Sequence, residues 1–224
     1  MPGKPPAYIV VEGPIGVGKT TLARRLAASF GSDLLLEAAG DNPFLPRFYQ
    51  QPETMALPTQ LFFLFQRTRQ VQSLRQGDMF RPVRVADYLL DKDRLFAQLT
   101  LNEEELALYD QVYAALTPEA PIPDLVIYLQ APVAVLYERI RKRGIATELP
   151  IEEDYLRRLS EAYIEFFHHY DAAPLLIVNA EEIDLASSEA DYTQLLDFLH
   201  DLPAGRHYFN PVTLADPAAA RSGR

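Results

Sequence analysis

The feature that most constrains the fold is a glycine-rich stretch between an apolar run and a helical pattern. The run Ala7–Val11 is typical of a buried strand, and Lys19–Phe30 has the apolar spacing of an amphipathic helix. Between them, Gly13–Thr20 matches the pattern G-x-x-x-x-G-K-[ST]. Glycines let backbone N–H groups converge on phosphate oxygens, and the start of the following helix adds its positive dipole end. Strand, loop and helix together predict a binding site for a nucleoside triphosphate.

Two side chains of this loop have predicted roles in catalysis and metal binding. Lys19 would bridge the terminal phosphates, and the hydroxyl of Thr20 would ligate Mg²⁺. The expected phosphate-binding residues are Gly13, Pro14, Ile15, Gly16, Val17, Gly18, Lys19, Thr20 and Thr21. ATP and Mg²⁺ are therefore the expected cofactors.

Further along the chain, apolar runs alternate with helical patterns. The expected strands are Asp33–Leu36, Pro82–Ala86, Leu125–Leu129 and Leu175–Val178. The expected helices are Pro58–Leu74, Glu103–Leu116, Val133–Arg143, Ile151–Tyr170 and Glu189–Leu199. This alternation predicts a three-layer α/β fold, in which helices flank both faces of a parallel sheet. We expect one domain over residues 1–202, and a loosely ordered tail over residues 203–224, which are rich in Pro, Ala and Gly.

Composition excludes several classes of protein. The chain has 224 residues, no cysteine and a formal net charge of -10. Without cysteine, neither a disulfide nor a Cys-ligated zinc can form. The acidic balance offers no electrostatic footprint for nucleic acid or for an anionic membrane. No apolar stretch has the length of a membrane span, and Met1–Lys4 lack the apolar core of a signal peptide. We therefore expect a cytoplasmic protein with no nucleic-acid or membrane partner.

Other triphosphate-binding classes have signatures that this chain lacks. Switch GTPases read guanine through N-K-x-D and carry D-x-x-G after a strand, and neither pattern occurs in the sequence. The signature of ABC-type ATPases is missing as well. The small size and an arginine-rich segment that could form a lid favour a kinase that acts on a small molecule.

The acceptor side of such a kinase is predicted at Glu37. This carboxylate follows Asp33–Leu36, at the carboxyl end of a strand, where ligands bind in open α/β sheets. A carboxylate that faces the phosphates there could take the proton from an attacking hydroxyl. The alternative is a solvated acid at the end of a strand.

A helix after this point carries a second candidate group. Gln60, Phe63 or Leu64, and Arg67 fall on one helical face. An amide, an aromatic ring and a guanidinium suit a flat heterocycle that is hydrogen-bonded at its edge and stacked on its face. The alternative is a core helix with two polar residues at its margin.

A cluster of cations reverses the charge of the chain locally, at Arg139, Arg141, Lys142 and Arg143. Arg139 and Arg143 stand four residues apart, hence on one face of a helix that ends at Gly144. Two guanidinium groups on one face would stabilise the charge of a phosphoryl-transfer transition state. The alternative is that they complement the helix dipole. Arg141 lies off this face and is expected at the surface.

Four stretches together resemble the deoxyribonucleoside kinases, a family that includes bacterial deoxyadenosine and deoxyguanosine kinases and the related deoxycytidine kinases. They read EGPIGVGKTTLARRL, LLLEAAGDNPFLPRFYQQPETMALPTQLFFLFQR, VRVADYLLDKDRLFA and RIRKRG…ELPIEEDYL, and the resemblance spans roughly residues 7–185. The motifs E-G-x-I-G-x-G-K, N-P-F-L-x-x-F-Y and Q-x-x-x-x-x-x-R are specific as a set. The resemblance implies a P-loop kinase fold with an arginine-bearing lid at residues 139–150, and a homodimer.

The resemblance also implies roles for single residues. Glu37 would be the base for a 5′-hydroxyl, and Tyr49, with Glu148 from the lid, would hold the sugar 3′-hydroxyl. Gln60 would pair with the edge of the base, and Arg67 would sit beside it. Arg139 and Arg143 would be the catalytic arginines of the lid.

The family's D/E-R-S motif is only partly present. Asp87 takes the place of its acid, near Mg²⁺ and the 5′-hydroxyl, and is the second expected metal ligand. The chain reads Asp87-Tyr88-Leu89, so the arginine and serine of the motif are absent. Asp93 is assigned as the second acid that contacts the base. The stretch VNAEEIDL follows the last strand where the family's adenine-contacting loop lies, and its register stays open.

The expected activity is transfer of the γ-phosphoryl group of ATP to the 5′-hydroxyl of a deoxyribonucleoside, in nucleotide salvage. Deoxyadenosine is favoured on resemblance, while deoxycytidine and deoxyguanosine stay open because the amide of Gln60 both donates and accepts. One alternative is a thymidylate-type nucleoside monophosphate kinase, whose acceptor phosphate Glu37 would repel. The other is a non-catalytic, nucleotide-dependent regulator.

Overall fold

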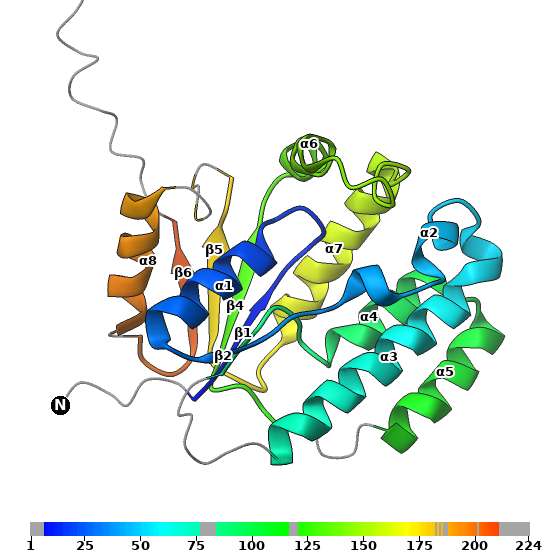
Figure 1. Cartoon of the computed structure of the whole chain (residues 1–224), viewed down its shortest axis with the longest axis horizontal. Coiled ribbons are helices and arrows are strands. Elements are labelled where there is room, and N and C mark those ends of the chain that lie inside the picture. Colours follow the sequence, from blue (N-terminus) through cyan, green and yellow to red (C-terminus); the bar gives the residue numbers. More distant parts are fainter. Residues whose placement is uncertain are drawn as a thin grey trace, which may run out of the picture.

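Six parallel strands form a single sheet at the centre of the molecule (Figure 1). The computed structural model describes residues 7–76, 84–116, 121–181, 183, 185, 188–200 and 202–210. The strands are β1 (Tyr8–Glu12), β2 (Asp33–Leu35), β3 (Arg84–Ala86), β4 (Leu125–Gln130), β5 (Leu175–Asn179) and β6 (Arg206–Phe209). They lie in the order β2-β3-β1-β4-β5-β6, and every neighbouring pair is parallel.

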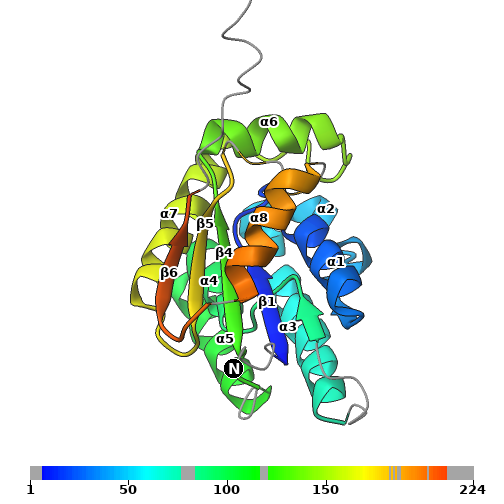
Figure 2. The ribbon, with the colours of Figure 1, turned by 90° about the vertical axis from the view of Figure 1, so that its left-hand side faces the viewer.

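Helices cover both faces of this sheet (Figure 2). They are α1 (Lys19–Phe30), α2 (Leu45–Phe48), α3 (Pro52–Gln76), α4 (Lys92–Thr100), α5 (Glu103–Leu116), α6 (Val133–Arg143), α7 (Glu153–His169) and α8 (Glu189–His200). Residues of α1 and α8 form one apolar cluster with the sheet, and residues of α4 and α7 form another on the opposite face. The predicted three-layer α/β architecture is confirmed.

The central strands bury both of their faces because nearly every side chain in them is apolar. Ile9 and Val11 pack into the cluster beneath α1, whereas Val10 points into the cluster beneath α7. All three side chains are fully buried. A strand that is covered on both sides needs such a continuous apolar run, and this is the signal that made β1 recognisable in the sequence.

The strand order places a crevice beside β1. The helix that follows β1 lies on one face of the sheet, while α4, which follows β3, packs on the other. Ligands of open α/β sheets bind where adjacent strands connect to opposite faces, outside their carboxyl ends. α6 crosses above these ends (Figure 2).

Most predicted elements agree with the structure. α1, α5 and α6 begin and end at the expected residues. α3 begins at Pro52 rather than at Pro58, which lies inside the helix. Either proline suits a first helical turn, where the N–H that proline lacks has no helical partner. The chain uses the earlier one and continues past the second.

Two elements differ from expectation. α4 was not predicted as a helix, and β6 lies where a loose tail was expected from Pro203. That prediction is wrong for Arg206–Phe209, which pairs with β5 at the edge of the sheet. Residues 211–224 of the expected tail, and Pro82 and Val83 of an expected strand, lie outside the described residues. Over the described part of the chain, no helix has the length and hydropathy to cross a membrane.

Candidate active site

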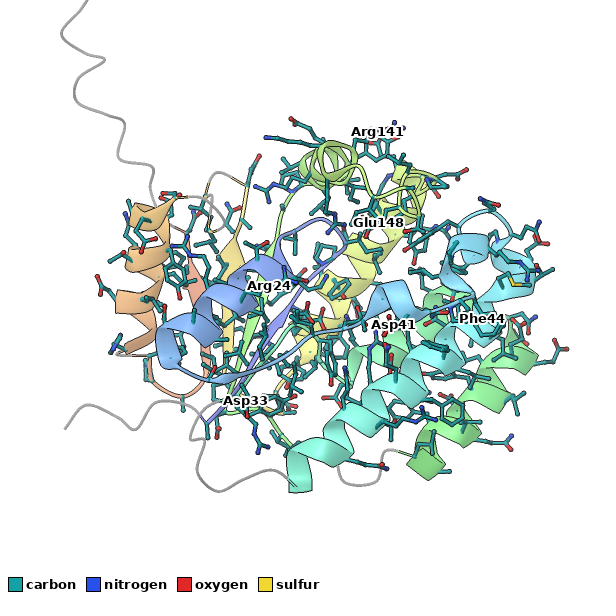
Figure 3. The ribbon with its side chains drawn as sticks, in the orientation of Figure 1. Arg24, Asp33, Asp41, Phe44, Arg141 and Glu148 are labelled. Carbon is teal, nitrogen blue, oxygen red and sulfur yellow. The ribbon has the colours of Figure 1, made fainter. Side chains whose placement is uncertain are left out.

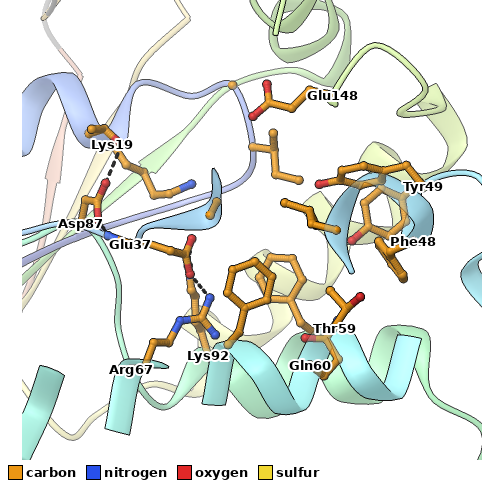
Figure 4. A pocket seen from close by; sticks show the side chains of 18 of the residues that line it. Lys19, Glu37, Phe48, Tyr49, Thr59, Gln60, Arg67, Asp87, Lys92 and Glu148 are labelled. Atoms are coloured by element: carbon orange, nitrogen blue, oxygen red, sulfur yellow. Dashed lines mark hydrogen bonds and ion pairs between the residues drawn. The ribbon is translucent and has the colours of Figure 1, made fainter. Parts of the chain in front are cut away.

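A cavity opens at the carboxyl ends of the strands beside the glycine-rich loop (Figure 4). Its walls come from that loop, from the segment after β2, from α2, α3 and α4, and from the segment around the end of α6. The lining residues are Ile15, Gly16, Lys19, Thr20, Glu37, Ala39, Leu45, Phe48, Tyr49, Thr59, Gln60, Phe63, Arg67, Asp87, Lys92, Phe96, Arg143, Glu148 and Tyr155. Most of the predicted site residues therefore share one cavity.

The glycine-rich loop is folded so that side chains are excluded where it turns. Gly13 and Gly16 have φ angles of 149° and 86°. A Cβ atom on Gly13 would lie 2.3 Å from the Leu129 carbonyl oxygen, and one on Gly16 would lie 2.8 Å from the Leu136 oxygen. Both positions therefore require glycine. The Gly13 N–H donates to Glu12, and the turns without side chains let later N–H groups of the loop approach an anion.

Lys19 points along the loop and bonds to it. Its Nζ donates to the carbonyl oxygens of Gly13 and Pro14, at 2.7 and 3.2 Å. Burial lowers the pKa of Lys19 to about 8, and the nearby ammonium of Lys92 adds to the effect. A cation that is desolvated and held by two neutral carbonyls is well placed to turn toward the stronger charge of a phosphate.

Thr20 and Asp87, the two predicted metal ligands, lie together. The Thr20 hydroxyl donates to Asp87 Oδ2, while Asp87 Oδ1 accepts the backbone N–H of Glu37 at 2.7 Å. Burial raises the pKa of Asp87, and the Thr20 hydroxyl opposes this rise. A hydroxyl and one carboxylate beside a phosphate-binding loop are oxygen donors of the kind with which Mg²⁺ is held against phosphates. The residues fit such an ion.

Glu37 faces the cavity between two cations. Its Oε1 forms an ion pair with Arg67 Nη2, and its Oε2 lies 3.8 Å from Lys92 Nζ. The other terminal nitrogen of Arg67 pairs with Asp93. The Cζ atom of Arg67 lies over the Phe63 ring, 4.9 Å from the ring centroid. Glu37 is 18% exposed, whereas Arg67 and Asp93 are almost fully buried. The carboxylate thus keeps access to the cavity.

The far end of the cavity can receive a flat ring. Gln60 lies there with Phe63 and Phe96. The amide nitrogen of Gln60 donates to Thr100 Oγ1 at 3.2 Å, and that hydroxyl donates in turn to the Phe96 carbonyl oxygen at 2.7 Å. The Gln60 amide is therefore oriented by Thr100, a residue that the sequence did not indicate.

The segment after α6 closes the cavity on the side of Tyr49. Arg143 and Glu148 form an ion pair, and both line the cavity. The ring of Tyr49 lies 6.4 Å from that of Tyr155, centroid to centroid. Burial is the main reason that the pKa of Tyr49 is raised, so its hydroxyl stays protonated and can donate a hydrogen bond.

Of the predicted phosphate-binding residues, Gly13, Pro14, Val17, Gly18 and Thr21 are not part of the cavity lining. Elsewhere in the chain, two further predicted site residues lie outside it. Arg139 donates to the Ala180 carbonyl oxygen at 2.8 Å, beside the loop that follows β5. Asp93 is held behind Arg67. Their assigned roles stay predictions. Arg141, expected at the surface, bonds to the Tyr137 hydroxyl at 2.6 Å and lies on the outer side of α6, with Glu148 on the side of the cavity (Figure 3).

Two charged residues were missed by the sequence analysis. Glu12, at the end of β1, is fully buried, and Lys92 contacts it at 3.3 Å. Signals for both were present. Glu12 closes an apolar strand, and Lys92 shares a helical face with Leu95 and Phe96 at i, i+3, i+4 spacing. A charge on an apolar stripe predicts a buried partner.

Comparisons with known proteins agree with the geometry. A family model described as "Deoxynucleoside kinase" matches residues 9–202. The chain is 34% identical over 204 residues to the deoxyguanosine kinase of Bacillus subtilis (strain 168), covering 87% of this chain and 97% of that protein. It is 29% identical to the deoxyadenosine/deoxycytidine kinase of the same organism, covering 85% and 90%. The solved structure of deoxyadenosine kinase from M. mycoides with bound dCTP has a TM-score of 0.75 at 24% identity, covering 87% and 100%, and shares the fold.

Proposed function

The chain belongs to the deoxynucleoside kinase family, and from this premise we propose that it transfers the γ-phosphoryl group of ATP to the 5′-hydroxyl of a purine deoxyribonucleoside. One observation carries the proposal. The carboxylate of Glu37 lies in the same cavity as Lys19 and Thr20 of the glycine-rich loop. A proton acceptor and a phosphate-binding loop that face each other are the parts that phosphoryl transfer to a hydroxyl requires.

In the proposed reaction, Glu37 takes the proton of the 5′-hydroxyl. The O–H bond breaks, the oxygen bonds to the γ-phosphorus, and the bond to the bridging oxygen breaks with its electron pair left on the diphosphate. Lys19 and Arg143 stabilise the charge on the transferred group. Mg²⁺, held by Thr20 and Asp87, would neutralise charge on the phosphates.

The other lining residues bind the nucleoside. Tyr49 and Glu148 hold the 3′-hydroxyl, with the phenol as donor and the carboxylate as acceptor. Gln60 bonds the edge of the base, which stacks on Phe63 with Arg67 beside it.

The choice of a purine rests on two supports. The family resemblance favours deoxyadenosine, and the relative with 34% identity is a deoxyguanosine kinase. Adenine and guanine present opposite donors and acceptors at their N1 edge. The amide of Gln60 can serve either base by turning over, so both purines are proposed as substrates.

A thymidylate-type monophosphate kinase is the competing enzyme. Its acceptor would bring a phosphate next to Glu37 and Asp87, and the repulsion between like charges disfavours it. A non-catalytic regulator would bind nucleotides in this cavity without turnover.

We propose further that the enzyme acts in the cytoplasm and that it is a homodimer. Sedimentation of the purified protein tests the dimer.

A substrate panel tests the proposed function. Deoxyadenosine, deoxyguanosine, deoxycytidine, thymidine and their 5′-monophosphates would each be offered with ATP and Mg²⁺, and kcat/KM compared. We expect the purine deoxynucleosides to rank first. Turnover of monophosphates alone would identify the competing kinase, and no turnover with any acceptor would favour the regulator.

A further inference from the structure

Lys92 is a lysine whose side chain is almost completely buried, at 2% exposure, at the start of α4. Lysine is seldom buried to this degree unless its charge is paired. Its ammonium lies 3.3 Å from Glu12 Oε1 and 3.8 Å from Glu37 Oε2. This ion pair borders the cavity, because Lys92 is part of its lining.

Glu12 does not depend on Lys92 for its hydrogen bonds. Its carboxylate accepts the backbone N–H groups of Gly13 at 2.9 Å and Leu89 at 2.7 Å, and the Tyr163 hydroxyl at 2.9 Å. These donors come from the glycine-rich loop, the segment after β3 and α7, so Glu12 is a fixed anchor. Since an ammonium has three N–H donors and Glu12 receives one of them, Lys92 keeps donors for the cavity side.

The segment after β3 supplies no other cation to the cavity. Tyr88 stands where the family's motif has an arginine, and its side chain is fully buried in the core cluster that includes Tyr163. Leu89 is also buried and gives its N–H to Glu12. Four residues after Tyr88, Lys92 brings a positive charge to the cavity beside Glu37.

A cation near Oε2 of Glu37 restricts rotation of the carboxylate. Arg67, which pairs with Glu37 Oε1, is itself tied to Asp93 on its far side. With Arg67 as its only ionic contact, the carboxylate could rotate about that contact. A second cation near Oε2 fixes the plane of the carboxylate, and precise placement of reacting groups contributes strongly to rate.

We propose that Lys92 is a positioning residue for the reaction: anchored by Glu12, its ammonium holds Glu37 Oε2 toward the acceptor hydroxyl and supplies the cation that Tyr88 cannot. This inference rests on the proposed function, because it assigns Glu37 as the base. Loss of the Lys92 ammonium should therefore lower kcat and leave the Kd of the nucleoside nearly unchanged.

The first test compares Lys92→Met with Lys92→Arg and with a matched control, Arg94→Met. Arg94 lies on the same helix, is 52% exposed and pairs with Asp110 at the surface. For Lys92→Met we expect kcat to fall about 100-fold, the scale of a misplaced catalytic group. We expect the Kd of the nucleoside, measured by calorimetry, to change less than about threefold, as for a group that acts on the chemical step. Lys92→Arg should retain more activity than Lys92→Met, and Arg94→Met should match the parent.

A second test separates the charge from the packing of the side chain. Because the chain has no cysteine, Lys92→Cys introduces a single thiol. Alkylation of the unfolded protein with 2-bromoethylamine rebuilds an ammonium of nearly lysine length, and alkylation with 2-bromoethanol gives a neutral counterpart. After refolding, both should melt at similar temperatures, and only the ammonium form should recover kcat.

The outcomes are decisive. Equal kcat for the two alkylated proteins, or for Lys92→Met and Arg94→Met, would overturn the proposal. It is also overturned if only the ammonium form refolds, because the charge would then be needed for the fold alone. If the parent enzyme phosphorylates none of the deoxynucleosides, the proposed function fails instead, and the two failures are therefore distinct.

Discussion

Replacement of Glu37 by glutamine tests whether this side chain accepts the proton of the acceptor hydroxyl. Glutamine has the shape of glutamate and keeps an oxygen that Arg67 can bond. Arg67 also retains its ion pair with Asp93, so the variant leaves no buried cation without a partner. The fold of Glu37→Gln should therefore persist, while the negative charge of the side chain and its capacity to accept a proton are removed.

The magnitude follows from what the cavity offers in place of Glu37. Asp87, another carboxylate of the lining, already accepts the Thr20 hydroxyl and the N–H of residue 37. It therefore cannot replace the base without loss of those bonds. Removal of a general base costs about 10² to 10⁴ in rate, which corresponds to about 3 to 5 kcal/mol in the activation barrier. The KM of the nucleoside should change much less, because the contacts to sugar and base are intact.

The assay is steady-state phosphorylation of deoxyguanosine and deoxyadenosine with saturating ATP and Mg²⁺. Glu104→Gln, at an exposed position of α5, is the matched control and should retain the parent kcat. Unimpaired turnover by Glu37→Gln would refute the assignment of the base. If the parent accepts monophosphates and Glu37→Gln accepts them better, the acceptor is an anion and the side chain is an obstacle to it.

Three further predictions concern the glycine-rich loop, the arginines of α6 and the residues that bind the nucleobase. Lys19→Ala should abolish transfer without lowering the melting temperature, because Lys19 acts on phosphate charge; a near-parental kcat would contradict the triphosphate site. Arg143→Ala should lower kcat by about 10² or more, as expected for a cation on the transition-state phosphate, whereas Arg141→Ala should change it little; equal losses would refute the one-face assignment. Thr100→Val should free the Gln60 amide to turn, because it removes one hydrogen bond of about 1 kcal/mol. The ratio of kcat/KM for deoxyadenosine to kcat/KM for deoxyguanosine should then change about fivefold. An unchanged ratio would show that Thr100 does not orient the amide.

Local patterns identified the parts of the site that are built from neighbouring residues. The loop before α1 was predictable because strand, glycines, lysine and threonine are consecutive in the sequence. The face with Gln60 and Arg67 was predictable because a single helix brings these residues together. The chemistry of such segments depends on spacing that the sequence displays directly.

Long-range pairs account for what the sequence did not reveal. Lys92 begins α4 and is buried against Glu12, which lies eighty residues earlier at the end of β1. No local spacing records that meeting. α4 spans only nine residues, so its apolar repeat is brief, although Asp91 at its N-cap is a residue type typical of a helix start. β6 is a short, largely exposed edge strand whose order depends on its partner β5.

The most direct test of the central claim is to locate the transferred phosphoryl group. The enzyme would be incubated with γ-labelled ATP, Mg²⁺ and deoxyguanosine or deoxyadenosine, and the product identified by NMR, with the corresponding 5′-deoxy nucleoside as a control acceptor. We predict labelled 5′-monophosphate from the parent nucleosides and none from the 5′-deoxy control. Label at the 3′-position, or label found only in inorganic phosphate, would contradict the account.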